Sequence, residues 1–322
     1  MSNSKSALII ATELATSGFE SGASLRVASI LDLVQKEGFV AKVVSRSEAK
    51  AALKSRWDLI VVISFSAARF LRGARKKTKN LWFDPTDSWT ITRVSLFRSG
   101  DAKQILVLIR DLFWLWTSPK IDFLTFITMQ DAQKENFWWK RRLVPSVLPI
   151  HGLDRNVLTG PEPRLIFIGD GVYKPNQDAK DFLRETLDWL DSATKIHLFG
   201  KGLTDADSRF VCHGYVPREQ LYFSQDIHLA PIFFGGGLKL KVAIPLWNGL
   251  RVIATPVSGN GFVSGKGLTI AQDPKGYAEQ IYRLLKDENS QIAPKPKGEI
   301  YQFDQTSLLV EWLRAKNTNT LE

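Results

Sequence analysis

Short apolar runs alternate with helix-like patterns along the first half of the chain. Runs of strand length occupy residues 7–12, 40–45, 59–64 and 80–83. Between the first two, residues 23–36 place Leu25, Ile30, Leu31 and Val34 at the spacing of one helical face. Strands that alternate with helices in this way predict a parallel, doubly wound α/β sheet.

The second half repeats this alternation after a linker marked by Pro161 and Pro163. Strand-like runs occupy residues 164–169, 195–200, 210–214 and 226–231, and residues 178–190 form a helical pattern. We therefore predict two Rossmann-like domains, residues 1–155 and 156–300. Residues 301–322 follow as a C-terminal helix, patterned over 305–314, that we expect to pack back on the first domain.

A glycine loop with two lysines is the most informative segment of the second half. The apolar run 227–234 ends in Gly235–Gly237, Lys239 and Lys241 follow, and a β-branched run occupies 252–255. This order predicts a strand, a loop, a helix and a second strand. Glycines at the start of a helix leave backbone N–H groups open to an anion, so the loop favours a phosphate site. The alternative is an ordinary glycine-rich turn, which is common in α/β domains.

The charge of the chain is distributed unequally. The net charge is +10, and residues 1–150 hold 23 basic against 13 acidic residues, whereas the remainder is neutral. The first half contains the cluster Arg69, Arg72, Arg75, Lys76, Lys77 and Lys79 and the run 140–142. A basic half predicts an anionic membrane, an acidic substrate or nucleic acid as partner. A basic face that only aids solubility is the alternative.

Several classes of protein are disfavoured by the composition. The longest apolar run, 105–116, is interrupted by Arg110 and Asp111 and is shorter than the ~20 residues of a membrane span. A signal peptide is not evident, and the single cysteine, Cys212, allows no intrachain disulfide, so we expect a cytoplasmic protein. The four histidines lack metal-ligand spacing, and the absence of a complete dinucleotide fingerprint argues against a dehydrogenase.

Five segments of the second half together resemble the nucleotide-sugar domain of GT-B glycosyltransferases of family 4. They are IFIGDGVYKPNQDAKDFL (166–183), IHLFGKG (196–202), VCHGYVPREQL (211–221), DIHLAPIFFGGGLKLKV (226–242) and NGLRVIATPVSGNGF (248–262). In the first half, the loop before Arg26, WFDPTDSW (82–89) and ITMQDAQKEN (127–136) resemble the acceptor domain of these enzymes. The resemblance implies two Rossmann-like domains that face a central cleft.

The resemblance also assigns candidate site residues. Donor binding is expected from a set of loop residues: Gly22, Gly171, Lys174, Gly214, Tyr215, Val216, Gly235, Gly236, Gly237, Leu238, Lys239 and Lys241. Among them, Gly235–Leu238 would bind the diphosphate through backbone N–H groups, and Lys239, Lys241 or Lys174 would neutralise it. Gly214, Tyr215 and Val216 would flank the base. Asp87 is the candidate for contacting the acceptor, and helix capping by Asp87 or Ser88 is the alternative.

One position departs from the family pattern. Family members place a ribose-binding glutamate five residues before the glycine at Gly249, where this chain has Ile244, followed by Pro245. Isoleucine accepts no hydrogen bond, and proline is tolerated in the first turn of a helix or at a kink, so we expect a late or bent helix. The resemblance further implies a retaining reaction, with the nucleotide sugar as substrate and neither a metal nor another cofactor.

Three functions follow, in decreasing order of support. The first is a glycosyltransferase that moves a sugar to a saccharide or lipid-linked acceptor in surface polysaccharide or glycolipid synthesis, peripheral to the inner face of a membrane. Aromatic residues among basic ones, at 113–116 and 137–139, favour the membrane, although core packing also explains them. The second is a pseudo-enzyme that serves as a binding or scaffold protein. The third, nucleic-acid binding, rests on charge alone, and we expect no such partner.

Overall fold

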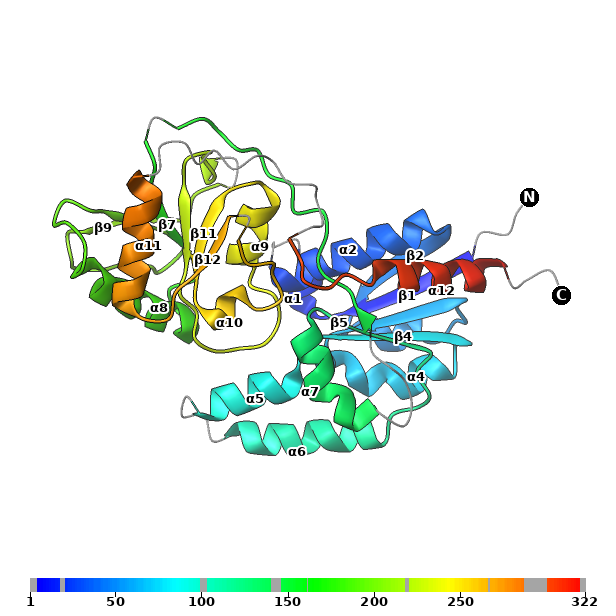
Figure 1. The fold of residues 1–322 in the computed structure, drawn as a ribbon. Helices are drawn as coiled ribbons and strands as arrows, with labels where there is room; N and C mark the ends of the chain where they lie inside the picture. The colour runs from blue at the N-terminus through cyan, green and yellow to red at the C-terminus, as the bar shows by residue number, and fades with distance from the viewer. Residues whose placement is uncertain are drawn as a thin grey trace. The chain divides into compact units, whose positions relative to one another are not determined.

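The computed structural model describes residues 5–17, 21–98, 103–139, 146–160, 162–217, 220–265, 267–286 and 300–318 of the 322-residue chain. The chain divides into two compact units (Figure 1). Unit 1 comprises Met1–Gly152, Gly235–Gly237 and Phe303–Glu322, and unit 2 comprises Leu153–Phe234 and Leu238–Gln302.

Unit 1 is built on a six-stranded sheet of order β2-β1-β3-β4-β5-β6, in which every pair is parallel. Its strands are β1 (Lys5–Ala11), β2 (Phe39–Ser45), β3 (Leu59–Ile63), β4 (Asn80–Thr86), β5 (Phe123–Phe126) and β6 (Ser146–Val147). β3 is buried at every position, which explains its uninterrupted apolar sequence LIVVI. The predicted parallel, doubly wound architecture is confirmed for this unit.

Helices cover both faces of the unit 1 sheet. They are α1 (Glu13–Thr16), α2 (Gly22–Lys36), α3 (Ala49–Ala52), η1 (Phe65–Phe70), α4 (Leu71–Arg75), α5 (Trp89–Arg98), α6 (Lys103–Trp116), α7 (Met129–Trp139) and α12 (Thr306–Thr318). One face buries Val27 and Ile30 of α2 together with Leu309 and Leu313 of α12. The other face packs against η1, α3 and α4, with Leu108 of α6 at its border.

Unit 2 contains a second parallel sheet of six strands, in the order β12-β11-β10-β7-β8-β9. Its strands are β7 (Leu165–Ile168), β8 (Ile196–Phe199), β9 (Phe210–Gly214), β10 (Ile227–Ala230), β11 (Arg251–Ala254) and β12 (Leu268–Ile270). Its helices are α8 (Lys174–Leu187), α9 (Leu240–Trp247), α10 (Pro256–Gly259) and α11 (Pro274–Lys286). This sheet likewise confirms the predicted fold class.

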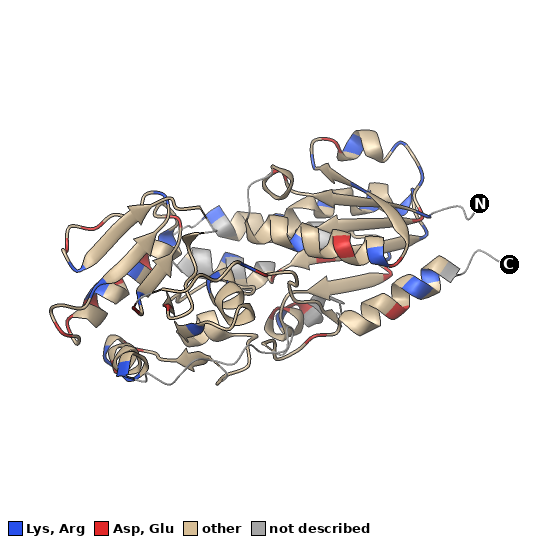
Figure 2. Ribbon diagram, turned by 90° about the horizontal axis from the view of Figure 1, so that it is seen from above, with Lys and Arg blue, Asp and Glu red and all other residues tan. Residues whose placement is uncertain are grey.

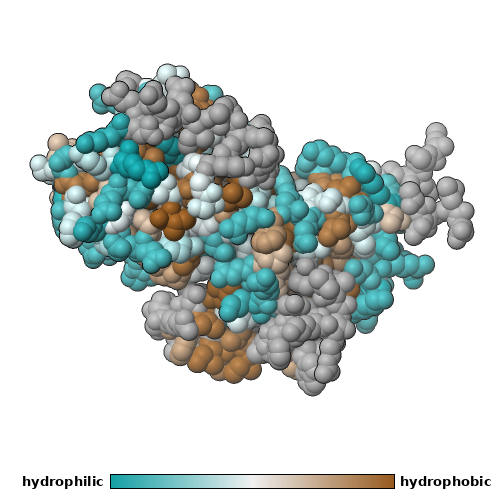
Figure 3. Space-filling view, viewed as in Figure 1, coloured by the Kyte–Doolittle hydropathy of each residue, from teal (hydrophilic) through white to brown (hydrophobic). Residues whose placement is uncertain are grey.

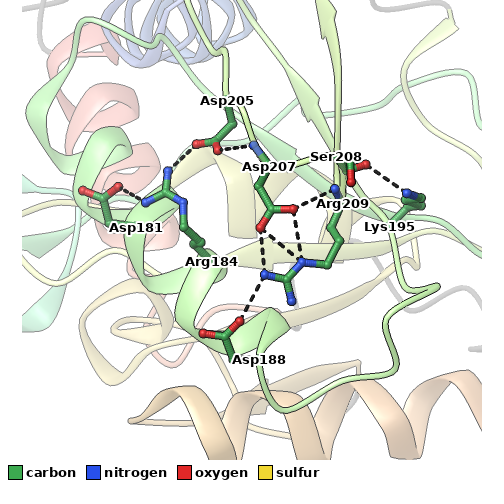
Figure 4. Close-up of polar contacts among 8 residues, drawn as sticks. All are labelled: Asp181, Arg184, Asp188, Lys195, Asp205, Asp207, Ser208 and Arg209. Atoms are coloured by element: carbon green, nitrogen blue, oxygen red, sulfur yellow. Dashed lines mark hydrogen bonds and ion pairs between the residues drawn. The ribbon is translucent and has the colours of Figure 1, made fainter.

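An ion-pair network holds the connection between β8 and β9 against α8 (Figure 4). Arg184 of α8 contacts Asp181 at 2.9 Å and also pairs with Asp205, while Arg209 contacts Asp207 at 2.7 Å. Hydrogen bonds from Arg209 lower the pKa of Asp207 to about 2. Because exposed pairs stabilise little individually, the network mainly fixes the course of this connection.

The strand order of unit 2 defines where a ligand would bind. β7 lies between β8 and β10, so the chain reverses its direction of winding beside β7. In open α/β sheets, ligands bind outside the carboxyl ends of the strands at such a switch point. The loop after β7 and the glycine loop after β10 both begin at this point, although the sequence separates them by about 60 residues.

Candidate donor site

Two glycine-containing loops of unit 2 pack together with their backbones in contact. Gly171 donates its N–H to Lys201 O at 2.8 Å, and Gly169 donates to Phe199 O at 2.9 Å. A Cβ on Gly171 would lie 2.0 Å from Gly202 O, and one on Gly200 would lie 1.7 Å from Gly169 O. This close approach of the two backbones leaves no room for a side chain at residue 171, so Gly171 is required for the packing of the two loops.

Gly200→Ala is expected to destabilise unit 2 by about 3 kcal/mol, since the new methyl overlaps a backbone carbonyl at φ +140°. The measurement is the midpoint of chemical denaturation. Gly265→Ala is the matched control, because Gly265 also has positive φ, +74°, but has no atom within 4 Å of the added Cβ. Equal losses for the two variants would contradict the packing argument.

Lys241 lies at the start of α9, and its contacts among the residues that the structure describes are an amide and an aromatic ring, neither of them negatively charged. Its Nζ donates to Asn176 Oδ1 at 2.6 Å and lies 4.4 Å from the centroid of the Phe167 ring. Loss of solvent around the ammonium, assisted by repulsion from Lys239, lowers the pKa of Lys241 to about 7. A bound phosphate would supply the missing counter-charge and raise this pKa again.

Asn176 connects Lys241 to the loop after β7. Its Nδ2 donates to Asp170 O at 2.8 Å, and its Oδ1 accepts from Lys241. The same loop is held by Gln177, whose Nε2 donates to Gly171 O at 3.0 Å. Asn176 was not among the predicted site residues. The only available signal was an amide in the first turn of a helix that follows a glycine loop.

The other two predicted lysines occupy different surroundings. Lys239 is the N-cap residue of α9, and its carbonyl accepts from Val242 N at 2.8 Å and Ala243 N at 2.9 Å. Lys174 begins α8 and is exposed, where it forms an ion pair with Asp178 that raises the pKa of its ammonium. Lys239 thus lies at a helix N-terminus, where an anion is stabilised, whereas Lys174 already has a carboxylate partner.

The three glycines Gly235–Gly237 belong to unit 1 rather than to the unit that surrounds them in sequence. Gly235 and Gly237 adopt φ of 98° and 72°, which strongly favour glycine. Gly237 donates its N–H to Asp131 Oδ1 at 3.4 Å, and a Cβ at this position would lie 3.2 Å from Asp87 Cβ. Two predicted regions, the glycine loop and Asp87, are therefore neighbours in space.

Buried acids hold the turn that carries Asp87. Ser88 caps α5 by accepting from Ile91 N at 3.0 Å, and its own N–H donates to Asp131 Oδ1 at 2.9 Å. Glu135 accepts from Thr90 N at 3.0 Å, and burial raises the pKa of this carboxyl to about 7. Of the two residues considered for capping, Ser88 has this role, so Asp87 is not needed for it. Thr86 just before it adopts φ 80°, a strained value of the kind that clusters at functional sites.

The remaining predicted residues lie at other strand ends and helix starts. Gly214 ends β9 with φ 64°, and Tyr215 beside it is 77% exposed. Val216 is partly buried. Leu238 follows the glycine loop and is partly buried, and Gly22 is the first residue of α2 in unit 1. Gly214 and Tyr215 thus lie at the end of the second strand beyond β7 in the sheet.

The departure at Ile244 has a clear structural counterpart. Ile244 is 6% exposed within α9, and both it and Pro245 are buried in the helix. α9 begins at Leu240, so Pro245 lies inside the helix and the expected late start is wrong. Pro245 has no N–H to donate to the carbonyl four residues earlier, whereas its own carbonyl accepts from Leu250 N at 2.9 Å just beyond the end of the helix. An isoleucine in this place offers no contact to a ribose.

Unit 1 has a polar cavity at the carboxyl ends of β1 and β2. Its volume is about 610 Å³, and it is lined by Glu13, Thr16, Val43, Ser45, Ser47 and Glu48. A hydrogen bond from Arg46 lowers the pKa of Glu13, and bonds from Ser45 lower that of Glu48. The cavity thus presents ionised carboxylates beside hydroxyl groups. Within the described residues, we find no cluster of three or more His, Cys, Asp or Glu that would hold a metal ion.

The comparisons with solved structures agree with this architecture. HepE from Anabaena, solved in complex with UDP-glucose, is 12% identical, with 97% of this chain and 98% of that chain covered and a TM-score of 0.62. A glycosyltransferase from Rickettsia africae is 11% identical, covered over 98% and 93%, with a TM-score of 0.56. The lipopolysaccharide outer core galactosyltransferase WaaB is 12% identical, covered over 97% and 99%, with a TM-score of 0.54. No curated protein matches the chain.

The fold is therefore that of the GT-B glycosyltransferases. Residues 162–287, which contain the whole switch point of unit 2, match the family "Glycosyl transferases group 1". The protein is a glycosyltransferase with a domain of this family, and the resemblance seen in the sequence is confirmed.

Proposed function

We propose that this protein transfers a sugar from a nucleotide-sugar donor to a saccharide or lipid-linked acceptor, with retention, in surface polysaccharide or glycolipid synthesis. The observation that carries the proposal is the cationic switch point of unit 2. There Lys241 has only the neutral amide of Asn176 and an aromatic ring as described partners. A donor diphosphate would place its negative charge beside this ammonium and the N-terminus of α9.

The chemistry requires little from the protein beyond charge stabilisation. The bond between the sugar carbon and the diphosphate oxygen breaks as the acceptor hydroxyl oxygen bonds to that carbon. The hydroxyl proton passes to the leaving diphosphate, whose charge Lys239 and Lys241 would stabilise. Asp87 would contact the acceptor, in accordance with its position in a strained turn of unit 1. In this proposal, neither the exchange of the sugar bond nor the transfer of the hydroxyl proton involves a metal ion.

The cavity of unit 1 supports an acceptor rich in hydroxyl groups. Glu13 and Glu48 are ionised at neutral pH, because their hydrogen bonds lower the pKa of each carboxyl. Carboxylates form strong hydrogen bonds with hydroxyl donors and repel anions. The part of the acceptor that enters this cavity would therefore be a neutral sugar rather than a phosphate.

Calorimetry with UDP-glucose and a panel of other nucleotide sugars tests the function. We expect one or more donors to bind, and we expect Lys239→Ala together with Lys241→Ala to weaken binding by roughly 100-fold, as the loss of charge-assisted contacts predicts. Lys174→Ala is the control, since Lys174 is already paired with Asp178. If no donor binds the wild-type protein, the proposal fails.

A second function is favoured by Ile244 alone. Without a ribose anchor at that buried position, the protein would be an impaired enzyme that acts as a binding or scaffold protein. Donor hydrolysis or transfer that is lost in Asp87→Asn would exclude this alternative. Donor binding without any turnover would favour it.

The location proposed for the protein is the cytoplasmic face of a membrane. No helix among the described residues has the length and apolar character needed to span a membrane. The basic excess of residues 1–150 favours a peripheral association with anionic lipid. Figure 2 shows that Lys and Arg occur in both units. The net positive charge of residues 1–150 therefore has two sources: these residues include only 13 of the 33 acidic residues of the chain, and they include 23 of its 43 basic residues.

A further inference from the structure

Helix α6 of unit 1 exposes large apolar side chains along one face. Leu106 is 71% exposed, Ile109 58%, Phe113 57% and Ile105 45%. Positions 106, 109 and 113 share a helical face because residues three and four apart lie one above the other. Leu108 points the other way and packs against the unit 1 core. The outer face of α6 is therefore an apolar stripe that the described part of unit 1 does not cover.

The neighbouring helix α5 also exposes a large apolar side chain. α5 and α6 lie side by side (Figure 1), and Phe97 of α5 is 44% exposed. In the space-filling view, hydrophobic residues gather over the region that α5 and α6 occupy (Figure 3). A contiguous apolar surface of this kind marks an interaction site rather than a scatter of single residues. Of the aromatic runs noted in the sequence, only Phe113 has a described side chain.

Cations flank the apolar stripe. Lys103 and Arg110 are exposed on α6 itself. α6 also packs beside η1, and Arg72 of α4 donates to Thr117 O just beyond α6 at 2.9 Å. This contact places the exposed residues Arg69, Arg72 and Lys76 on the elements next to α6. Apolar residues bordered by cations match the acyl chains and anionic headgroups of a lipid surface.

We propose that the α6 stripe docks unit 1 on an anionic lipid bilayer, with α6 lying in the plane of the membrane. A helix of 14 residues is ~21 Å long, which is too short for the ~30 Å hydrocarbon core, so α6 does not span it. A second copy of the chain fits less well. A symmetric pair would bring the flanking cations of the two stripes together, where they repel each other. The proposal rests on the proposed function, in which the protein associates with a membrane, and it identifies α6 as the element that contacts the lipid. This position would fit an acceptor held in lipid.

Vesicle sedimentation tests the proposal. The full chain is expected to bind vesicles of phosphatidylcholine and phosphatidylglycerol in equal parts, to bind phosphatidylcholine alone weakly, and to bind less as salt increases. Leu106→Glu with Ile109→Glu should lower binding by more than about tenfold, because two apolar side chains no longer enter the lipid. Arg110→Gln should lower it roughly fivefold.

Leu308→Glu is the matched control, because Leu308 is an exposed leucine, 46%, on α12 of the same unit. It should bind vesicles as the wild type does. Undiminished binding by the α6 double variant would overturn the proposal. So would a dimer in sedimentation velocity that the same double variant dissociates. UDP-glucose binding to each variant in the absence of lipid separates failure of this proposal from failure of the proposed function.

Discussion

Replacing Arg26 by methionine is expected to lower the free energy of unfolding of unit 1 by about 3–5 kcal/mol. Arg26 and Asp84 form an ion pair in which both side chains are fully buried. Nε of Arg26 donates to Asp84 Oδ1 at 3.2 Å, and NH1 donates to the carbonyl of Leu148. Without Arg26, the carboxylate of Asp84 would remain buried with only the hydroxyl of Thr125 as a described side-chain donor.

Chemical denaturation, with hydrogen exchange at β1 and β4 amides to report on unit 1, measures the effect. Arg46→Met is the matched control. Arg46 pairs with Glu13, but the side chains are 31% and 47% exposed, so its loss should change the stability far less than the loss of Arg26 does. The stability of Arg26→Lys should lie between those of Arg26→Met and Arg46→Met, because lysine keeps the positive charge but loses the bidentate geometry of the guanidinium. Equal stabilities of Arg26→Met and Arg46→Met would refute the assignment.

Donor affinity is expected to depend on pH through Lys241. Its pKa in the free protein is about 7, lowered from 10.5, and a bound diphosphate would raise it. Binding therefore takes up a proton above pH 7, so the affinity for UDP-glucose should fall as pH rises from about 7 toward 9. Below pH 7 the ammonium is already protonated and the affinity should level off. The fall approaches tenfold per pH unit at its steepest.

Calorimetry across this range checks the prediction, and the heat in buffers of different ionisation enthalpy gives the proton uptake. Lys241→Met should bind UDP-glucose more weakly than the wild type does, and its affinity should not fall as pH rises from 7 toward 9. Lys174→Met should keep the slope, because the pKa of Lys174 is raised rather than lowered. Glu135, with a pKa of about 7, titrates in the same range. A slope that survives in Lys241→Met would assign the titration to such a group and not to Lys241.

The sheets of both units were predictable because their strands are buried and apolar. The run LIVVI in β3 is buried throughout, so no polar residue interrupts the signal. α6 was not predicted as a helix. Its sequence is apolar on both its inner side, at Leu108, and its outer side, at Leu106 and Ile109, so the length of the apolar run was more conspicuous than its helical period.

The candidate site was predictable only in part. Glycines in loops are conspicuous in a sequence, so Gly171, Gly235 and Gly237 could be singled out, and the structure shows close backbone contact at Gly171 and positive φ at Gly235 and Gly237. Asn176 was missed because its importance comes from contacts with Lys241, which lies 65 residues further along the chain. Likewise, the proximity of Asp87 to Gly237 depends on how the chain folds back, which local spacing does not contain. The roles of these residues in donor and acceptor binding remain predictions.

The position of helix α12 at the end of the described chain affects when unit 1 can be completed during synthesis. It is the last described element, yet Leu309 and Leu313 are fully buried in the core of unit 1, and Lys5 at the start of β1 donates to Lys316 O at 2.6 Å. Unit 2 lies between these two parts of unit 1 in the chain. On the ribosome, the first strands of unit 1 therefore emerge long before the helix that completes their core. During translation, one face of the unit 1 sheet is therefore incompletely covered until α12 has been made. All strands of unit 2 are made before that point.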